Sequence, residues 1–321
     1  MQTDNEVDSF LEDAGWGAAT RVDIAADFSS RLFSRLTREE DASPKTAILM
    51  RADSDHRTDA FVHIAALLRR LGLAAPDIYA SDVLRDLVLM EDFGDASIAR
   101  LIDAGQPRDP FDAAAAHTLA HLHSKFEQRM FGAFKTSLYN AALFTDQATL
   151  FLDHYCPRLL RRAPTAMERS GFVEAWHDVL SPLDALPRSL VLRDFMPDNA
   201  MVLAKPVFGT TFGLLDFQDA GLGPVAYDIA SWCEEVRRDG GLERLEGFVA
   251  AYHAINPAVE EADLLTAARV YAAQRHVRIL GRLIQLDKPA FTPRVWKAFQ
   301  FLMKDEALMP VRRWFVSCTR T

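Results

Sequence analysis

The stretch Val191–Leu203 reads V-L-R-D-F-M-P-D-N-A-M-V-L, and Gly213–Asp219 follows it with G-L-L-D-F-Q-D. Two short apolar runs flank residues 205–209, which include a proline and a glycine, so this pattern predicts a β-hairpin. Residues equidistant from the turn of an antiparallel hairpin face each other. We therefore expect Asn199 and Asp216 to face each other at the open end of the hairpin.

A third polar group stands close by in the sequence. Asp194 follows the apolar residues 190–192 and precedes Asn199 by five positions, on what we expect to be a loop. Two carboxylates and an amide oxygen that converge on one point suit a hard cation such as Mg²⁺. The stretch alone therefore predicts a magnesium site built from Asp194, Asn199 and Asp216.

The composition is that of an ordinary globular protein and excludes several classes of function. Of the 321 residues, 49% are hydrophobic and 25% are charged. The net charge of −9 argues against a nucleic-acid-binding protein, and no apolar run is long enough to span a membrane. The N-terminal residues 1–8 are polar and do not form a secretory signal, and the three cysteines lie far apart. We expect a cytoplasmic protein that is a monomer or a weak dimer.

Strands dominate the first part of the chain and helices the rest. Hydrophobic periodicity predicts helices at 4–14 and 58–71 and strands at 20–26, 31–38, 46–51, 77–81 and 86–90. Beyond residue 95 it predicts helical segments at 112–128, 141–162, 165–185, 224–237, 241–254, 261–286 and 291–316. This segregation predicts an α+β fold with two lobes, residues 1–91 and residues 92–321.

The pattern R-D-x-x-x-x-N at 193–199, followed by D-F at 216–217, is the signature of the protein-kinase-like fold. On these residues the chain resembles the aminoglycoside phosphotransferase family of small-molecule kinases. Within it, the chain is most similar to bacterial kinases that phosphorylate the anomeric hydroxyl of N-acetylmuramate or N-acetylglucosamine. Further motifs carry the likeness: L-M-E-D-F-G-D at 89–95, G-P-V-A-Y-D-I-A-S at 223–231 and Q-R-H-V-R-I-L-G-R-L at 274–283.

The resemblance implies a small β-rich N-terminal lobe that binds ATP and a larger, mainly helical C-terminal lobe that binds the acceptor. It implies that Asp194 accepts the proton of the acceptor hydroxyl, while Asn199 and Asp216 hold Mg²⁺ against the ATP phosphates. It also implies that Arg193 fixes the catalytic loop and that Asp228 braces that loop from the next helix.

The N-terminal lobe departs from the general kinase pattern. The segment 25–32, between the first two predicted strands, contains no glycine, and Met50 stands where a protein kinase has its strand-three lysine. The predicted helix 58–71 contains no glutamate, so the usual Lys–Glu ion pair cannot form there.

Other groups must then meet the phosphates of the nucleotide. We expect backbone N–H groups around residues 27–30 and the hydroxyls of Ser29 and Ser30 to contribute. The missing positive charge would come from Arg31, Arg35 or Arg51, and the sequence leaves these three open.

The remaining site residues belong to the adenine and the acceptor. The segment Glu91, Asp92 and Phe93 resembles the hinge of a kinase, where adenine pairs with backbone groups, and we expect its acidic side chains to face solvent. The planar guanidinium of arginine can donate two parallel hydrogen bonds to a carboxylate, and the face of a tryptophan ring can stack on a sugar ring. The acceptor pocket is therefore predicted to use Trp232, Glu234, Arg275 and Arg278, although the arginines could equally form a solvated basic stripe.

Three functions are compatible with these residues. The first is an ATP- and Mg²⁺-dependent kinase of a small polar acceptor, with N-acetylmuramate or N-acetylglucosamine preferred. The second is a non-catalytic pseudokinase or nucleotide-binding module, favoured by the missing lysine, glutamate and glycines. The third is an aminoglycoside kinase, since an acidic protein attracts a polycationic substrate.

Overall fold

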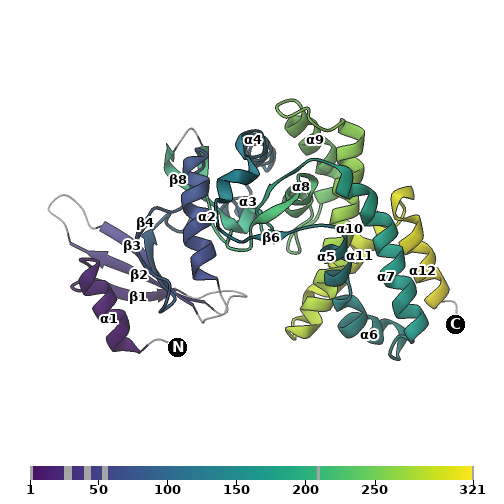
Figure 1. The fold of residues 1–321 in the computed structure, drawn as a ribbon, viewed down its shortest axis with the longest axis horizontal. Helices are drawn as coiled ribbons and strands as arrows, with labels where there is room; N and C mark the ends of the chain where they lie inside the picture. The colour runs from purple at the N-terminus through teal and green to yellow at the C-terminus, as the bar shows by residue number, and fades with distance from the viewer. Residues whose placement is uncertain (1–2, 25–30, 40–44, 53–56, 208–209, 320–321) are drawn as a thin grey trace. The chain divides into compact units, whose positions relative to one another are not determined.

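The computed structural model of the chain describes residues 3–24, 31–39, 45–52, 57–207 and 210–319 (Figure 1). The chain forms two compact units. The first unit comprises residues 1–108, 131–134 and 197–220, and the second comprises residues 109–130, 135–196 and 221–321. The predicted hairpin therefore groups with the N-terminal strands, whereas the predicted lobe boundary after residue 91 placed it with the helices.

Within its described residues, the first unit contains a five-stranded antiparallel sheet with the order β1-β2-β3-β5-β4. The helix α2 (Thr58–Arg70) joins the third strand to the fourth. The strands are β1 (Thr20–Ile24), β2 (Leu32–Arg38), β3 (Lys45–Arg51), β4 (Ile78–Asp82) and β5 (Leu87–Glu91). Short apolar or partly alternating runs located all five strands: β2 and β3 alternate in part, whereas β5 is a nearly continuous buried run.

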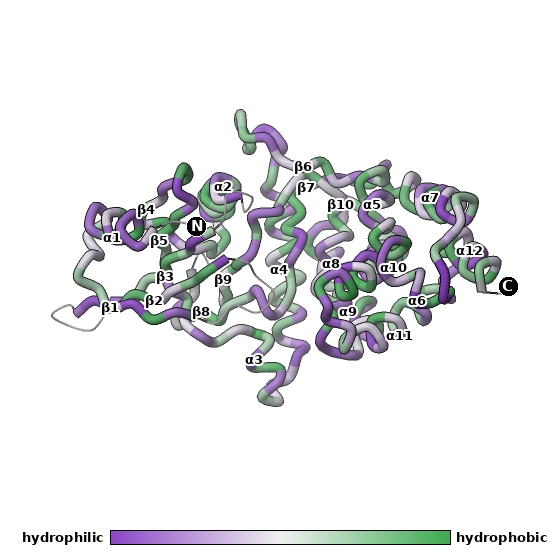
Figure 2. Tube along the Cα trace, turned by 90° about the horizontal axis from the view of Figure 1, so that it is seen from below, coloured by the Kyte–Doolittle hydropathy of each residue, from purple (hydrophilic) through white to green (hydrophobic). Residues whose placement is uncertain are grey.

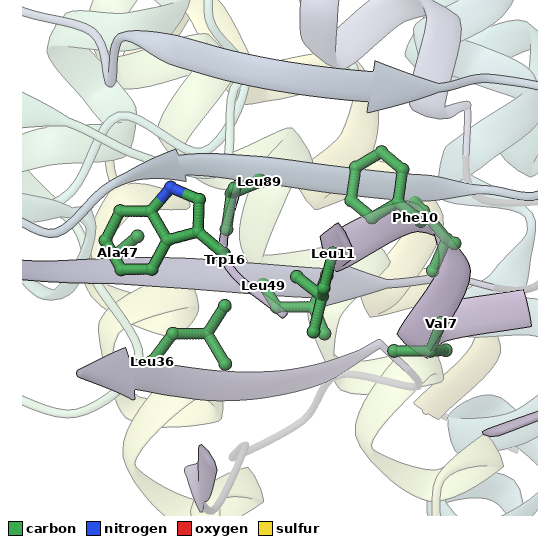
Figure 3. Packing of buried hydrophobic residues seen from close by; sticks show 9 residues of the cluster. Val7, Phe10, Leu11, Trp16, Leu36, Ala47, Leu49 and Leu89 are labelled. Carbon is green, nitrogen blue, oxygen red and sulfur yellow. The ribbon is translucent and has the colours of Figure 1, made fainter. Parts of the chain in front are cut away.

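An N-terminal helix, α1 (Asp4–Asp13), packs on this sheet. Thr3 and Glu6 form a capping box at its start, which satisfies backbone N–H groups that the first turn would leave unpaired. Figure 3 shows its apolar side chains against the strands, and the cluster comprises Val7, Phe10, Leu11, Trp16, Leu36, Ala47, Leu49, Leu87 and Leu89. Burying each large side chain contributes about 1.5–3 kcal/mol, so α1 is an integral part of this unit.

The hairpin consists of β8 (Ala200–Val207) and β9 (Thr210–Leu214). Its register pairs Ala200 with Leu214 and contains an irregularity between Val202 and Val207. Consequently the N–H of Leu215 donates to the carbonyl of Asn199, at 2.9 Å. The backbone of Asn199 therefore lies opposite Leu215, and the expected pairing with Asp216 was wrong by one residue. The reason is a bulge, which places extra residues on one strand and shifts the register of the pairs beyond it.

Two backbone hydrogen bonds tie the hairpin into the first unit. The N–H of Leu214 donates to the carbonyl of Ala74, and the N–H of Val202 donates to that of Ala96, both at 2.7 Å. A short helix, α3 (Ile98–Asp103), follows Ala96. The hairpin is thereby fixed to the segment that follows β5.

The second unit is mainly helical, and Figure 2 shows hydrophobic and hydrophilic residues alternating along its helices, as amphipathic packing requires. Its α-helices are α4 (Asp109–Lys125), α5 (Ala141–Ala148), α6 (Cys156–Leu160), α7 (Ala166–Leu180), α8 (Ala226–Cys233), α9 (Gly241–His253), α10 (Glu261–Gln285), α11 (Thr292–Leu302) and α12 (Met309–Thr319). Among the described residues, no helix is both long and apolar enough to cross a membrane.

Two predicted helices are interrupted. The expected helix at 291–316 is two helices, because Pro310 has no N–H to continue the hydrogen-bond ladder and Asp305 caps the next turn by accepting from Ala307. The expected helix at 141–162 contains a π-helical turn, Phe151–Tyr155, between α5 and α6.

A small sheet in the second unit was not predicted. In the described part of this unit, β6 (Ser137–Leu138), β10 (Gly221–Pro224) and β7 (Arg188–Val191) pair in the order β6-β10-β7. Gly223 and Pro224 therefore end a strand, and the helix predicted at 224–237 begins two residues later, at Ala226, and ends at Cys233. These strands are too short to show a period of their own, and their partners lie far away in the sequence.

Candidate active site

The first unit holds a cavity of about 370 Å³. Its apolar lining includes Phe33, Ile48, Met50, Phe61, Met90 and Leu215. Its polar lining comprises Arg31, Arg35, Asp198, Asn199, Asp216 and the acidic residues of the segment 91–95. A cavity with an apolar side and a few convergent polar groups is the usual form of a small-molecule site.

The predicted metal ligands meet at this cavity. Asn199 ends a 3₁₀ turn, Pro197–Asn199, and its Nδ2 lies 3.4 Å from Oδ2 of Asp216. Asp216 has a φ of 59°, a left-handed conformation that is uncommon for a residue with a side chain. Such strain persists only where the surroundings enforce it, and it is concentrated at functional sites.

Two neighbours hold Asp216 in place. The Nε2 of Gln218 donates to Oδ1 of Asp216 at 2.9 Å. Phe217, between them, is buried and stacks on Phe61 with ring centroids 4.9 Å apart. Phe217 thus lies in the core of the first unit beside the carboxylate.

The donor set fits a magnesium ion bound with a nucleotide. Rotating the Asn199 amide would present its oxygen beside the Asp216 carboxylate, and Mg²⁺ takes few protein ligands when phosphates supply the others. Among the described residues, no cluster of three or more His, Cys, Asp or Glu side chains forms a complete metal site. This pair is therefore suited to a metal that arrives with phosphate oxygens.

Arg31 also borders the cavity. Its side chain is largely buried, and NH1 lies 3.5 Å from Oδ1 of Asp216. The predicted phosphate ligands Ser29 and Ser30, just before it, lie outside the described residues.

The guanidinium of Arg35 binds two carboxylates of the hinge segment, those of Asp92 and Asp95. Its Nε and NH2 donate to the two oxygens of Asp92 at 2.7 and 3.2 Å, and NH1 and NH2 donate to Asp95 at 3.1 and 2.9 Å. Its hydrogen bonds to Asp95 and Asp92 raise the pKa of Arg35 and also lower that of Asp95. The Asp92 side chain is only 5% exposed, so the expectation that the hinge acids face solvent was wrong for this residue.

Met50 and Arg51 fall on opposite sides of β3, because successive side chains alternate along a strand. Met50 pairs with Phe33 and lines the cavity, as the sequence comparison of strand three implied. Arg51 pairs with Leu32, is half-buried and is not among the described lining residues.

In the second unit, the segment that precedes Asp194 is strained and strongly braced. Arg193 has a φ of 75°. The carboxylate of Asp228, fully buried, accepts from the N–H of Leu192 at 2.6 Å and from that of Arg193 at 3.0 Å. The carbonyl of Arg193 accepts from Ser231 Oγ and from Arg275 NH1, both at 3.1 Å.

Burial also sets the protonation of this brace. Because Asp228 is buried, its pKa rises from an ordinary 3.8 to about 6, although the two backbone hydrogen bonds and the nearby Arg275 and Arg193 oppose the rise. Asp228 is therefore ionised at neutral pH but takes up a proton in mild acid.

The side chain of Arg193 is enclosed by aromatic rings. Its guanidinium lies 4.4 Å from the centre of Tyr139 and 4.7 Å from that of Tyr227, and NH2 donates to Gln147. Cation–π contacts therefore hold the guanidinium of Arg193, together with its hydrogen bond to the amide oxygen of Gln147. Asp194, the next residue, is half-buried, and its N–H donates to the carbonyl of Leu192.

Three of the four predicted acceptor residues are buried with internal partners. Arg275, 1% exposed, also donates to the hydroxyl of Tyr227. Trp232 donates to Asp112 at 2.6 Å, and Glu234 pairs with His276 at 2.8 Å. Arg278 is half-buried, and burial lowers its pKa.

These positions bear on the two interpretations of the arginines. The alternative of a solvated basic stripe was wrong for Arg275, since its guanidinium supports the backbone of Arg193. The acceptor role of all four residues stays a prediction.

Sequence reasoning missed three supporting residues. Gln218 and Ser231 follow Asp216 and Asp228 at spacings of two and three, so both lie near a recognised acid in the sequence. Those spacings were the available signal. Gln147 offered none, because its contact with Arg193 joins residues far apart in the chain.

The three predicted metal ligands are divided between the two units. Asn199 and Asp216 are brought together in the first unit, and Asp194 with its brace belongs to the second. The convergence of all three on one ion stays a prediction.

The sequence signature of the phosphotransferase enzyme family matches residues 20–265. An N-acetylmuramate/N-acetylglucosamine kinase from Caulobacter vibrioides is 28% identical over 96% of this chain and 94% of its own length. One from Pseudomonas putida is 27% identical, covering 93% of this chain and 88% of its own. The GDP complex of aminoglycoside 2'-phosphotransferase-IIIa superposes with a TM-score of 0.64 at 13% identity, covering 94% of this chain and 98% of that one. This likeness confirms the predicted kinase-like fold class.

Proposed function

The chain belongs to the phosphotransferase enzyme family, and on that basis we propose that it moves the γ-phosphate of ATP to a hydroxyl of an amino sugar. The observation that carries this proposal is the Asn199–Asp216 pair at the border of the cavity in the first unit. An apolar cavity with a carboxylate and an amide at its polar side suits a base and a metal-bound phosphate chain.

Each part of the cavity has a role in this proposal. The apolar residues receive the adenine, with backbone groups of Asp92 and Phe93 as its pairing partners. Asn199 and Asp216 would hold Mg²⁺, which would supply charge neutralisation for the phosphates.

The second unit supplies the groups that act on the acceptor. Asp194 accepts the proton of the attacking hydroxyl and orients its oxygen. The strained backbone of Arg193, held by Asp228, Ser231 and Arg275, fixes the direction of the Asp194 side chain. Rigid placement of the base is what a phosphoryl transfer needs most from the protein, since its transition state needs little covalent help.

The choice of acceptor rests on the relatives. The two kinases named above act on N-acetylmuramate and N-acetylglucosamine by their names, and they align along nearly the whole chain. We therefore propose N-acetylmuramate or N-acetylglucosamine as the acceptor.

A coupled assay of ADP release tests this function. The purified chain is given ATP, Mg²⁺ and, in separate reactions, N-acetylmuramate, N-acetylglucosamine, choline or kanamycin. We expect turnover with one or both amino sugars and none with choline. Turnover with kanamycin alone would instead identify an aminoglycoside kinase.

A non-catalytic nucleotide-binding protein is the second candidate, because Met50 lines the cavity where kinases have a lysine. Binding of Mg²⁺–ATP without ADP release in any of the four reactions would favour it over the kinase.

A further inference from the structure

The charges around the cavity are unfavourable for a nucleotide. Among the described residues that line it, five are acidic, Glu91, Asp92, Asp95, Asp198 and Asp216, and two are arginines, Arg31 and Arg35. ATP carries several negative charges on its phosphates, so a cation of the protein must lie beside them. Met50 occupies the cavity wall without supplying one.

Arg35 is already committed to other partners. Four hydrogen bonds join its guanidinium to Asp92 and Asp95, and the Asp92 side chain is only 5% exposed. Turning Arg35 toward a phosphate would leave the buried Asp92 carboxylate without its counter-charge, which is costly in a desolvated position. Arg35 is therefore a structural support of the hinge segment.

Arg51 is placed less suitably than Arg31. It follows Met50 on β3 and so projects from the other side of the strand. It is also not among the described residues that line the cavity.

Arg31 has the position that the phosphates require. It lines the cavity, its side chain is largely buried, and NH1 lies 3.5 Å from Oδ1 of Asp216. This distance is at the long limit of a hydrogen bond, so the contact is weak in geometry although the charges are opposite. A guanidinium matches phosphate oxygens in a bidentate manner and stays charged when buried.

We propose that Arg31 is the phosphate-binding cation of this enzyme and takes the part that a strand-three lysine has in protein kinases. This assignment rests on the proposed nucleotide-dependent function. In the free protein Arg31 balances Asp216. A metal that arrives with the nucleotide would balance the Asp216 carboxylate, and Arg31 would then be released to bind the phosphates.

Nucleotide binding, measured calorimetrically without any acceptor, tests the proposal. Wild type, Arg31→Met, Arg31→Lys, Arg35→Met and Arg51→Met are each titrated with adenosine, ADP and ATP, both with Mg²⁺ and with EDTA. Arg85→Met is the matched control, since Arg85 is exposed and pairs with Asp82 away from the cavity lining. Urea unfolding of each variant checks that the fold is retained.

The expected losses differ among the ligands. Arg31→Met should weaken ATP and ADP about 10- to 100-fold, the worth of a charge-assisted hydrogen bond, while adenosine binds as in wild type. Arg31→Lys should recover part of the lost ATP and ADP affinity, because lysine keeps the positive charge but cannot donate two parallel hydrogen bonds to a phosphate. Arg35→Met should lower the affinity for all three ligands by a similar factor, since Asp92 and Asp95 of the hinge segment lose their hydrogen bonds to Arg35. Arg85→Met should change none of the three affinities.

Three outcomes would overturn the assignment. These are wild-type ATP affinity in Arg31→Met, an equal loss of adenosine and ATP in that variant, or a phosphate-dependent loss in Arg51→Met. Failure of the proposed function looks different, because wild type itself would then either bind neither ATP nor ADP, or bind them and release no ADP with any acceptor.

Discussion

Asp194 is the side chain on which the proposed chemistry depends most directly. It follows a backbone held in a left-handed conformation by Asp228, Ser231 and Arg275. A left-handed non-glycine residue costs about 1–3 kcal/mol, which the buried hydrogen bonds offset. These hydrogen bonds hold the backbone conformation of the residue from which the chain continues to Asp194.

Replacing this carboxylate should remove catalysis and leave binding intact. We expect Asp194→Asn to lower kcat by about 10²- to 10⁴-fold, the usual contribution of a general base, with unchanged ATP affinity. Steady-state kinetics with the amino sugar and calorimetry with ATP measure the two quantities. Asp178→Asn, at an exposed position of α7, is the matched control. Wild-type turnover in Asp194→Asn would refute its role as the base.

The pKa of Asp228 predicts an acid limit of activity. Below pH about 6 its carboxylate takes up a proton and can no longer accept fully from the N–H groups of Leu192 and Arg193, so the loop loosens. We expect kcat to fall as the pH drops through 6, and Asp228→Asn to be weakly active without this limb. A limb that persists unchanged in Asp228→Asn would assign it to another group.

The same protonation acts on stability in the opposite direction. An acid whose pKa is raised on folding binds its proton more tightly in the folded chain, so its contribution to stability grows as the pH falls. For Asp228 this window runs from about 6 down to 3.8. If kcat falls below pH 6 while the contribution of Asp228 to the free energy of unfolding rises, the loss of activity comes from loosening of the loop and not from unfolding of the chain.

His123 predicts acid destabilisation. It is buried beside the hydroxyl of Tyr252, 2.9 Å away, and burial lowers its pKa from 6.5 to about 3. The unfolded chain therefore binds the proton more tightly below pH 6.5, and stability falls by about 1.4 kcal/mol per pH unit as the pH drops. Urea unfolding at pH 7 and pH 5 should show that wild type loses about 2 kcal/mol more stability than His123→Phe over this interval, because the contribution of Asp228 is common to both proteins. An equal pH dependence in both proteins would exclude the histidine as its source.

At the scale of elements, close approaches of backbone decide where bulky residues are excluded. A Cβ on Gly281 of α10 would clash with the backbone of Leu150, beside the π-helical turn. This close approach explains why α10 carries a glycine in its interior, where glycine otherwise weakens a helix.

Filling that contact should destabilise the second unit. We expect Gly281→Ala to lower the free energy of unfolding by about 1–3 kcal/mol, since α10 must move away from Leu150. Gly247→Ala in α9 is the control, because a Cβ there meets nothing within 4 Å. It should be neutral or stabilising by about 0.4–1 kcal/mol. Thermal and urea unfolding measure both, and equal effects would refute the steric explanation.

The hairpin shows how an element corrects a local prediction. Its two strands and the meeting of Asn199 with Asp216 followed from the apolar runs, and residues 208–209 of the predicted turn lie outside the described part of the chain. Its register did not, because a bulge depends on how β8 and β9 pair and not on either strand alone. The left-handed φ of Asp216 is likewise a product of its surroundings.

At the scale of the whole molecule, nucleotide binding should stabilise the folded chain. A ligand at about 100 times its Kd adds about 2.7 kcal/mol to the free energy of unfolding. We expect ATP to raise Tm by several degrees with Mg²⁺ present and by less with EDTA. In Asp216→Asn the difference between Mg²⁺ and EDTA should disappear. An equal effect of ATP with and without Mg²⁺ in wild type would argue against a metal at Asn199 and Asp216.

The sequence by itself determined the strands and helices of strong period, the hairpin, the family and the identity of Asp194, Asn199 and Asp216 as candidates. These depend on local periodicity, turn residues and fixed spacings, all of which are visible in the order of residues. Only the tertiary structure showed that Arg35 is bound by Asp92 and Asp95 and that Arg51 is not among the described residues lining the cavity. It also showed that Arg275 and Trp232 are buried against internal partners and that β6, β10 and β7 form a sheet. The physical reason is that burial and hydrogen-bond partners come from residues distant in the chain, and no local pattern contains them.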